Sequence, residues 1–216
     1  MLQNLKQSFY NPLCLYCGSF FVCDHLFCEK CYKIFFSDLT LIENKHVPFE
    51  HHFLINWSPG QSDLVSEMVY RLKSDRGARA WAHYASIITQ SLADRLDLET
   101  FDALLPLPGS KSSSVHAWLL AKNIGQELAL PVLNVLTKSP STRAQKTKSA
   151  SERAFIGSDS QLLLDEQFTR EELSNLKLIY VDDILTTGQT FKRAAEAVGA
   201  RSQSILVTMF YRPRAL

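Results

Sequence analysis

Two groups of residues in this chain of 216 residues have the types and spacing that chemistry requires. The first is a set of cysteines near the N-terminus, where Cys14 and Cys17 form one C-x-x-C pair and Cys28 and Cys31 form a second. Each pair can make a tight turn that aims two thiolates at one point. Two such turns close a tetrahedral Zn²⁺ site with no open position. We therefore expect a structural Zn²⁺ site with these four cysteines as ligands.

Alternatives to the zinc site are a redox-active C-x-x-C pair and a cluster of buried thiols. Cys23 and His25 lie between the pairs and could replace one of the four ligands. Neither completes a further pair with regular spacing, so we expect Cys23 to be free. All five cysteines lie between Cys14 and Cys31, and so short a segment has little core of its own. Metal binding would supply most of its folding free energy.

The second group is an acidic pair near the C-terminus. Asp182 and Asp183 follow the short apolar run Leu178–Val181, which has the composition of a strand, and a turn over Ile184–Gly188 leads into a helical pattern over Phe191–Val198. A turn at a helix start presents backbone N–H groups and the positive end of the helix dipole to an anion. This order of elements predicts a phosphate site.

Residue types in the turn support a phosphorylated sugar as the ligand. Gly188 allows a phosphate to approach the main chain, and hydroxyl donors are provided by Thr186, Thr187 and Thr190. The two carboxylates repel a phosphate but can accept hydrogen bonds from a sugar diol. The implied ligand is a ribose 5-phosphate. The alternative is an ordinary strand-to-helix loop whose acids face water.

This motif resembles the phosphoribosyl pyrophosphate motif of type I phosphoribosyltransferases: an apolar strand, two acids, two apolar residues and then Thr-Thr-Gly. The resemblance implies that Asp182 and Asp183 recognise the ribose hydroxyls. It implies 5-phosphate recognition by Thr186, Thr187, Gly188 and Thr190.

Hydrophobic periodicity predicts the elements that would position these groups. Strands are expected near residues 53, 103, 133, 179 and 206, and they alternate with helices over 62–72, 78–96, 115–130 and 191–198. This alternation predicts an α/β fold with a mostly parallel sheet flanked by helices, which by the resemblance is of the type I phosphoribosyltransferase-like kind. Its ligand should lie at the carboxyl ends of the strands. We expect a zinc ribbon over residues 1–45 and the α/β domain over 46–216.

A tight loop is expected after the strand near residue 103. By the resemblance, this loop is the pyrophosphate loop, formed by Leu107, Pro108, Gly109, Ser110 and Lys111. Three histidines, His46, His51 and His52, lie before and within the strand near residue 53. They could form a metal or acid–base site, but no further ligand has matching spacing, and solvent-facing or core histidines are the alternative.

Basic residues gather at two places. Arg71, Lys73, Arg76 and Arg79 lie between two predicted helices, where they form either a solvated helix junction or a cationic corner near the active site. The segment 138–160 has no clear period, and it is either a disordered loop or a mobile segment that closes over a polyphosphate or follows a nucleic-acid backbone. Its candidate contacts are Arg143, Lys146, Lys148 and Arg153.

Composition places few limits on function. A formal charge of +1 and a pI near 7.7 give no general attraction to nucleic acid or membrane, and a hydrophobic content of 46% is ample for a packed core. No apolar run has the length needed to span a bilayer, and the N-terminus does not resemble a signal peptide. We expect a cytoplasmic protein with no membrane insertion.

Taken together, these motifs resemble the ComF family, in which a four-cysteine zinc ribbon is fused to a phosphoribosyltransferase-like domain. The family's stretch between the motifs is matched by Thr142-x-x-Gln145, by Glu152-Arg153-x-Phe155 and by Tyr70–Lys73. One departure is that the family's Arg-Gly-Phe-Asn-Gln is replaced here by Ser112–His116. The missing arginine leaves Lys111 and His116 as its candidate substitutes, unless part of the site has been lost.

Three hypotheses follow from the resemblance. The first is a role in natural transformation, the cytoplasmic handling of incoming single-stranded DNA beside a competence helicase and a recombination mediator, with phosphoribosyl pyrophosphate or a related phosphate as ligand. The second is an active phosphoribosyltransferase in nucleotide salvage, with Mg²⁺ bridging the diphosphate. The third is a ligand-gated protein scaffold whose ribbon docks a partner. No general base is evident, because Thr186 stands where purine-salvage enzymes often carry an acid.

Overall fold

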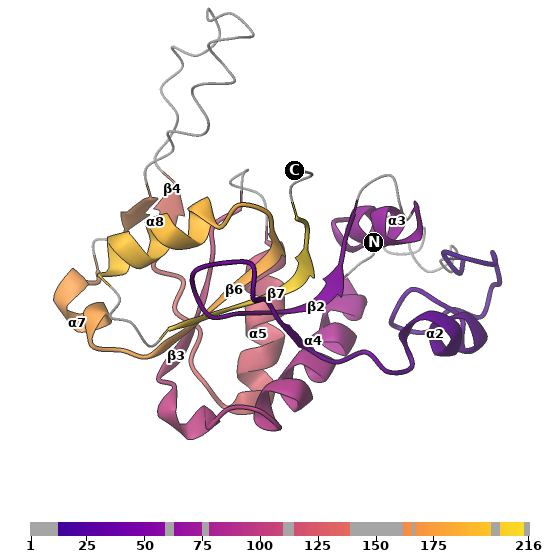
Figure 1. Ribbon diagram of the computed structural model, residues 1–216, viewed down its shortest axis with the longest axis horizontal. Coiled ribbons are helices and arrows are strands. Elements are labelled where there is room, and N and C mark those ends of the chain that lie inside the picture. The colour runs from indigo at the N-terminus through magenta and orange to yellow at the C-terminus, as the bar shows by residue number, and fades with distance from the viewer. Residues whose placement is uncertain are drawn as a thin grey trace, which may run out of the picture.

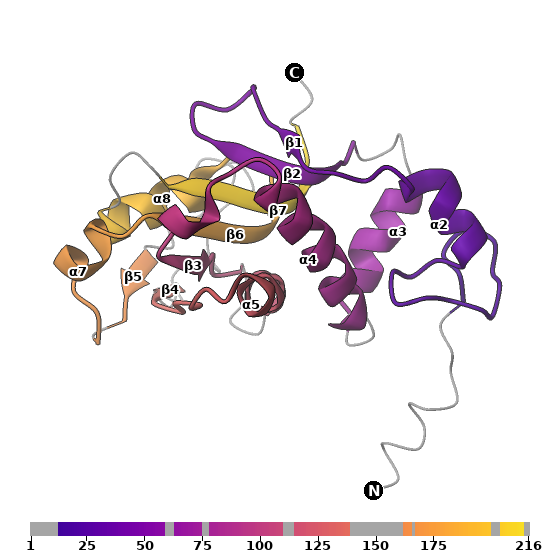
Figure 2. The same cartoon turned by 90° about the horizontal axis from the view of Figure 1, so that it is seen from below.

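The computed structural model describes residues 13–58, 63–74, 78–109, 115–138, 162–165, 167–199 and 204–213. Helices and strands are interspersed along the chain, and Figures 1 and 2 show them from two directions. In chain order they are α2 (Glu29–Phe36), β1 (Ile42–Glu43), β2 (His51–Asn56), α3 (Asp63–Leu72), α4 (Ala78–Ala93), the 3₁₀ helix η2 (Leu98–Thr100), β3 (Ala103–Pro106), α5 (His116–Leu128), β4 (Leu136–Lys138), β5 (Leu162–Leu164), α7 (Arg170–Ser174), β6 (Leu178–Leu185), α8 (Gln189–Val198) and β7 (Ile205–Tyr211).

The main sheet has the strand order β1-β2-β7-β6-β3. β2, β7, β6 and β3 are parallel, and only the short edge strand β1 is antiparallel. The prediction of an α/β fold with a mostly parallel sheet flanked by helices is confirmed. The strand expected near residue 133 is wrong in this form, because Val132 makes only an isolated bridge to Leu104. The chain then enters β4, which pairs with β5 in a separate two-stranded sheet.

Alternating side chains divide the core into two halves, one on each face of the sheet. On β6, Ile179 and Val181 pack with apolar residues of α3, α4 and α5. Leu178 and Tyr180 point to the opposite face, where they pack with α7, α8 and the β4–β5 pair. Because β6 is central and covered on both sides, its first four residues are all buried, as expected of a parallel strand.

The cysteine segment, residues 13–36, packs against α3 and α4 at one end of the sheet (Figures 1 and 2). Tyr84 on α4 donates its hydroxyl proton to the backbone oxygen of His25 at 2.9 Å, and His83 Nε2 lies 2.9 Å from the Tyr32 hydroxyl. Phe27 is fully buried in the same core cluster as the α4 residues. The cysteine segment therefore shares a continuous hydrophobic core with the α/β body, and the boundary at residue 45 stays a prediction.

Within the described ranges, none of the helices is both long enough and apolar enough to cross a bilayer.

Candidate phosphate and metal sites

The acidic pair lies inside β6 rather than after it. The expected strand ended at Val181, but the backbone stays extended to Leu185, because the long strand β7 pairs with it all along this length. Asp182 lies opposite Thr208, and Leu185 lies opposite Tyr211. The predicted turn over Ile184–Gly188 is therefore too long. Its first two residues belong to the sheet, and the turn is Thr186–Gly188.

The turn is shaped by Gly188, whose φ of +74° lies in the left-handed region. A Cβ added at this position would lie 2.8 Å from the ring of Phe49, so the glycine is required both by the backbone and by the close contact. Phe49 in turn packs on Phe191 of α8, with ring centroids 4.6 Å apart. Phe49 comes from the loop between β1 and β2, and no local sequence pattern indicated this support.

Helix α8 begins directly after the turn. Lys192 donates its backbone N–H to Gly188 O at 2.9 Å, which closes the first helical turn. Helix geometry gives the backbone N–H groups of Thr190 and Phe191 no acceptor within the helix. Thr186 is exposed, and Thr187 and Thr190 are half-buried. Donors from the backbone and from hydroxyl groups therefore lie together at the positive end of α8, as a bound phosphate would require.

Asp182 and Asp183 are half-buried. The backbone N–H of Asp183 donates to Asp182 Oδ1 at 2.8 Å. Burial, together with the charge of Asp183, raises the pKa of Asp182 well above its usual range, while Lys73 acts in the opposite direction. The carboxyl oxygens of the pair can accept hydrogen bonds from the hydroxyl groups of a diol.

Lys73, at the end of α3, supplies the positive charge for this pair. Its Nζ lies 2.8 Å from Asp183 Oδ2, and the side chains of Lys73 and Asp183 are 40% and 15% exposed. The sequence left two alternatives for the basic residues in this region, a solvated helix junction and a cationic corner near the active site. For Lys73, the contact with Asp183 favours the cationic corner. Arg71 is half-buried and Arg79 is exposed, and Arg76 lies outside the described residues.

His116, the first residue of α5, also belongs to this edge of the sheet. Its ring stacks on Trp81, with centroids 6.1 Å apart and planes 25° apart, and its buried Nδ1 has no hydrogen-bond partner among the described residues. Burial lowers the pKa of His116. The charge of Asp183 opposes that change and the charge of Lys73 adds to it. A neutral imidazole is thus held near the acidic pair.

The predicted pyrophosphate loop begins beside the acids. Leu107 is buried and donates its N–H to Val181 O at 2.8 Å, which continues the β3–β6 pairing by one residue. Its amide is therefore used within the sheet. Pro108 and Gly109 are half-buried beyond it. Ser110 and Lys111 lie outside the described residues, and so do the candidate contacts Arg143, Lys146, Lys148 and Arg153.

The four predicted metal ligands come together. The Sγ atoms of Cys14, Cys17, Cys28 and Cys31 all lie within 4.8 Å of one another, and those of Cys17 and Cys28 are 3.7 Å apart. Burial raises the pKa of Cys14, but hydrogen bonds from the backbone amides of Cys17, Cys28 and Tyr16 outweigh it, and the net result is a pKa of about 6. Four converging thiols with amide support fit a closed four-sulfur zinc site.

The three histidines in and before β2 do not come together as a metal or acid–base site among the described residues. His51 is fully buried, its Nδ1 lies 2.9 Å from Asn44 Nδ2, and its Nε2 lies 2.9 Å from Thr208 Oγ1. Burial lowers the pKa of His51 to about 3, so this ring is neutral. His52 is also buried and lies beside Glu50, and His46 is exposed. Two of the three are therefore core histidines.

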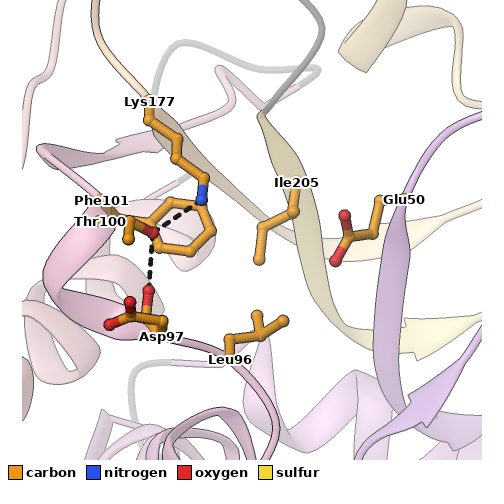
Figure 3. A pocket seen from close by; sticks show the side chains of 7 residues that line it. All are labelled: Glu50, Leu96, Asp97, Thr100, Phe101, Lys177 and Ile205. Atoms are coloured by element: carbon orange, nitrogen blue, oxygen red, sulfur yellow. Dashed lines mark hydrogen bonds between the residues drawn. The ribbon is translucent and has the colours of Figure 1, made fainter.

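A cavity of about 300 Å³ lies at the opposite edge of the sheet (Figure 3). Its lining includes Glu50, Phe101, Lys177 and Ile205, each just before or at the start of a strand. Lys177 Nζ already donates to Thr100 Oγ1 at 2.7 Å and lies 4.3 Å from the Phe101 ring centroid. Lys177 and Thr100 are paired with one another, and Glu50 lies 3.1 Å from His52, which is outside the lining. The carboxyl ends of the strands instead present backbone N–H donors at the start of α8. The carboxyl edge is therefore the stronger candidate site.

Comparison with known proteins gives a distant structural neighbour. No protein-family model matches the chain. No curated protein matches it either. One matching solved structure is the adenine phosphoribosyltransferase from Leishmania donovani, with 12% sequence identity, coverage of 79% of this chain and 86% of that chain, and a TM-score of 0.41.

Proposed function

We propose that this chain binds phosphoribosyl pyrophosphate, or a closely related ribose 5-phosphate, at the carboxyl ends of β6 and β7. The observation that carries the proposal is the sequence of groups along β6 and α8: a half-buried acidic pair, then the turn Thr186–Gly188, then a helix N-terminus. In this arrangement the acids hold the ribose hydroxyls, and the turn and the first residues of α8 hold the 5-phosphate.

Charge around the acids supports a ligand that carries both a diol and phosphates. Lys73 neutralises part of the acidic pair, and the helix N-terminus offers partial positive charge close by. A nucleobase or an uncharged sugar would leave these groups unused. The remaining phosphate contacts are proposed for the loop that begins at Pro108, including Lys111. Mg²⁺ bound to the diphosphate would neutralise charge there.

Calorimetric titration of phosphoribosyl pyrophosphate with Mg²⁺ tests the proposal. The wild-type protein should bind, and the variant Asp182→Asn/Asp183→Asn should lose at least tenfold in affinity, because neutral amides are weaker acceptors for the ribose hydroxyls. Asp102→Asn is the matched control: Asp102 is an exposed acid at the opposite edge of the sheet, where it accepts the Lys177 backbone N–H at 2.7 Å. Absence of wild-type binding would remove the proposal.

Whether the ligand also reacts is a separate question. In a transfer reaction, a nucleophilic nitrogen forms a bond to C1 of the ribose, pyrophosphate leaves with the electrons of the broken C–O bond, and the nitrogen's proton passes to a base. Positioning would supply most of the effect. Pyrophosphate release measured across a set of nucleobases separates an active phosphoribosyltransferase from a protein that only binds the ligand.

The proposed biological role is that of a ComF-type protein in natural transformation, handling incoming single-stranded DNA in the cytoplasm with a helicase and a recombination mediator. It is supported by two features in one chain, the four converging cysteines and the acidic-pair site. We further propose that the four cysteines hold a structural Zn²⁺. Single-stranded DNA binding that weakens steeply with salt is the expected result, and binding that is absent or independent of salt contradicts the DNA part of the role.

A further inference from the structure

A second group of metal-binding side chains lies in the cysteine segment, beside the four cysteines. One potential ligand atom each from Cys23, His25 and Glu29 lie within 4.8 Å of one another. Cys23 and His25 come from the turn between the two C-x-x-C pairs, and Glu29 is the first residue of α2. The sequence left Cys23 without a role, and this grouping gives it two neighbours of different chemistry.

The turn that carries Cys23 and His25 is held firmly by the backbone. Cys23 donates its N–H to Phe27 O at 2.9 Å, and Leu26 donates its N–H back to Cys23 O at 3.1 Å. Leu26 has a φ of +75°, an uncommon conformation for a residue with a large side chain. Phe27, which anchors the turn, is fully buried. The three side chains are therefore brought together by a defined backbone.

The side chains themselves show incomplete hydrogen bonding. His25 is only 6% exposed and stacks on Tyr32, with ring centroids 3.8 Å apart. Its buried Nδ1 has no hydrogen-bond partner among the described residues. A buried nitrogen without a hydrogen-bond partner is unfavourable, so a ring that is left this way needs an explanation. Glu29 directs Oε1 to Lys33 at 3.1 Å, while Oε2 lies 4.0 Å from Cys23 Sγ.

We infer that Cys23, His25 and Glu29 form a second zinc site, with a water molecule in the fourth position. A thiolate, an imidazole and a carboxylate together suit Zn²⁺ rather than Mg²⁺ or Ca²⁺, which prefer oxygen ligands alone. One thiolate and one carboxylate also balance the charge of the ion. The two sites share no ligand, although Cys28 and Glu29 are adjacent in the chain.

Geometry allows this site to form with small movements. Zinc ligands in a tetrahedral site lie about 3–4 Å apart, given bonds of about 2.0–2.3 Å. The ligand atoms of this cluster lie within 4.8 Å of one another, so they must move together by about 1 Å. The exposed side chains of Cys23 and Glu29 can make this movement, while the buried His25 ring stays in place. Three protein ligands leave one coordination position open, so this second ion differs from the closed four-cysteine site. It can bind an additional oxygen, nitrogen or sulfur donor.

Metal content of the full chain tests the inference, independently of phosphoribosyl pyrophosphate. The tag-free protein is saturated with Zn²⁺, passed through a desalting column and analysed for zinc and protein. Two zinc ions per chain are expected for the wild type and one for Cys23→Ser and for Glu29→Gln. Both changes are at exposed side chains, so the fold should persist, and circular dichroism checks this. Asp38→Asn changes an exposed acid just after the cysteine segment and outside the cluster, and this variant should retain two ions.

Cobalt substitution gives a second readout that does not depend on stoichiometry alone. Loading with Co²⁺ should give an intense sulfur-to-metal absorption from the four-cysteine site, and a weaker component that disappears in Cys23→Ser. A wild-type protein that retains only one zinc ion overturns the inference. So does a Cys23→Ser variant that retains two ions, because the second ion would then lie elsewhere.

Discussion

Lys73 Nζ lies 2.8 Å from Asp183 Oδ2, which joins the end of α3 to the carboxyl half of β6. The two residues are far apart in the sequence, and the contact links the helical layer on one face of the sheet to the acidic pair at its edge. Lys73 thereby offsets the repulsion between Asp182 and Asp183 when no ligand is present. A ligand that uses the acids must compete with this ion pair or bind beside it.

We predict that Lys73 and Asp183 are energetically coupled by about 0.5–1 kcal/mol, the range for a partly exposed ion pair. Lys73→Met should lower the midpoint of thermal unfolding by about 1–3 °C in the wild type, and by less in the Asp183→Asn background. A double-mutant cycle of urea unfolding measures the coupling. Additive effects of the two changes would show that the pair contributes nothing to stability.

Asp182 should reduce the stability of the ligand-free protein at neutral pH. The pKa of Asp182 is raised in the folded state, so the folded protein binds the Asp182 proton more tightly than the unfolded chain does. Proton binding therefore increases the free energy of unfolding, and this contribution is complete below the ordinary Asp pKa. This contribution is lost as the pH rises through the folded-state pKa. Asp182→Asn has no proton to lose, so at pH 8 it should be more stable than the wild type by about 1 kcal/mol.

Thermal unfolding at pH 4.5 and pH 8 checks this prediction. Asp182→Asn should have a higher midpoint of thermal unfolding than the wild type at pH 8. The difference in midpoint should be smaller at pH 4.5, where Asp182 retains its proton. Asp102→Asn, a change at an exposed acid near the amino ends of the strands, is measured in parallel as the control. An Asp182→Asn variant that is less stable than the wild type at pH 8 contradicts the prediction. The same variant should bind phosphoribosyl pyrophosphate less tightly.

Local patterns predicted the parts of the site that are consecutive in the chain. The order of strand, acids, glycine turn and helix was visible because Asp182, Gly188 and Thr190 lie within one short stretch. The end of the strand was not predicted correctly, because β6 extends past Val181 through its pairing with β7. Pairing between strands depends on residues distant in sequence, and composition alone does not encode it.

Long-range contacts account for the other differences. Lys73 was one of several basic residues between two helices, and only the packing of α3 beside β6 distinguishes it. Phe49 had no recognisable role until the fold placed its ring against Gly188. The shared core between Phe27 and α4 was hidden for the same reason, since the spacing of cysteines reports a metal site but not the surface on which that site rests.

Gly188 and Gly199 allow a matched test of the phosphate turn, because they flank the two ends of α8 with the same φ of +74°. An added Cβ meets the rigid ring of Phe49 at Gly188, but it meets the flexible Arg170 side chain at Gly199. Gly188→Ala should therefore cost about 2–3 kcal/mol, and Gly199→Ala about 1 kcal/mol. Unfolding in urea measures both.

The two variants should also differ in ligand binding. Gly188→Ala displaces the turn that would hold the 5-phosphate, so the affinity for phosphoribosyl pyrophosphate should fall at least tenfold. Gly199→Ala leaves the turn unchanged and should bind like the wild type. Equal affinity in Gly188→Ala and Gly199→Ala would place the phosphate elsewhere.

Metal removal should affect α4 as well as the cysteine segment. Tyr84 donates to the His25 backbone oxygen, and Tyr32 contacts His83, so a cysteine segment that unfolds without its metal uncovers one side of α4. Chelation, or Cys14→Ser, should therefore increase hydrogen exchange in α4 by at least tenfold, while β6 and β7 remain protected. Mass spectrometry of peptides from these elements measures the difference. Unchanged exchange in α4 would contradict the prediction. It would mean that the packing of Phe27 against α4 contributes nothing to the stability of α4, and that the α/β body is independent of the metal site.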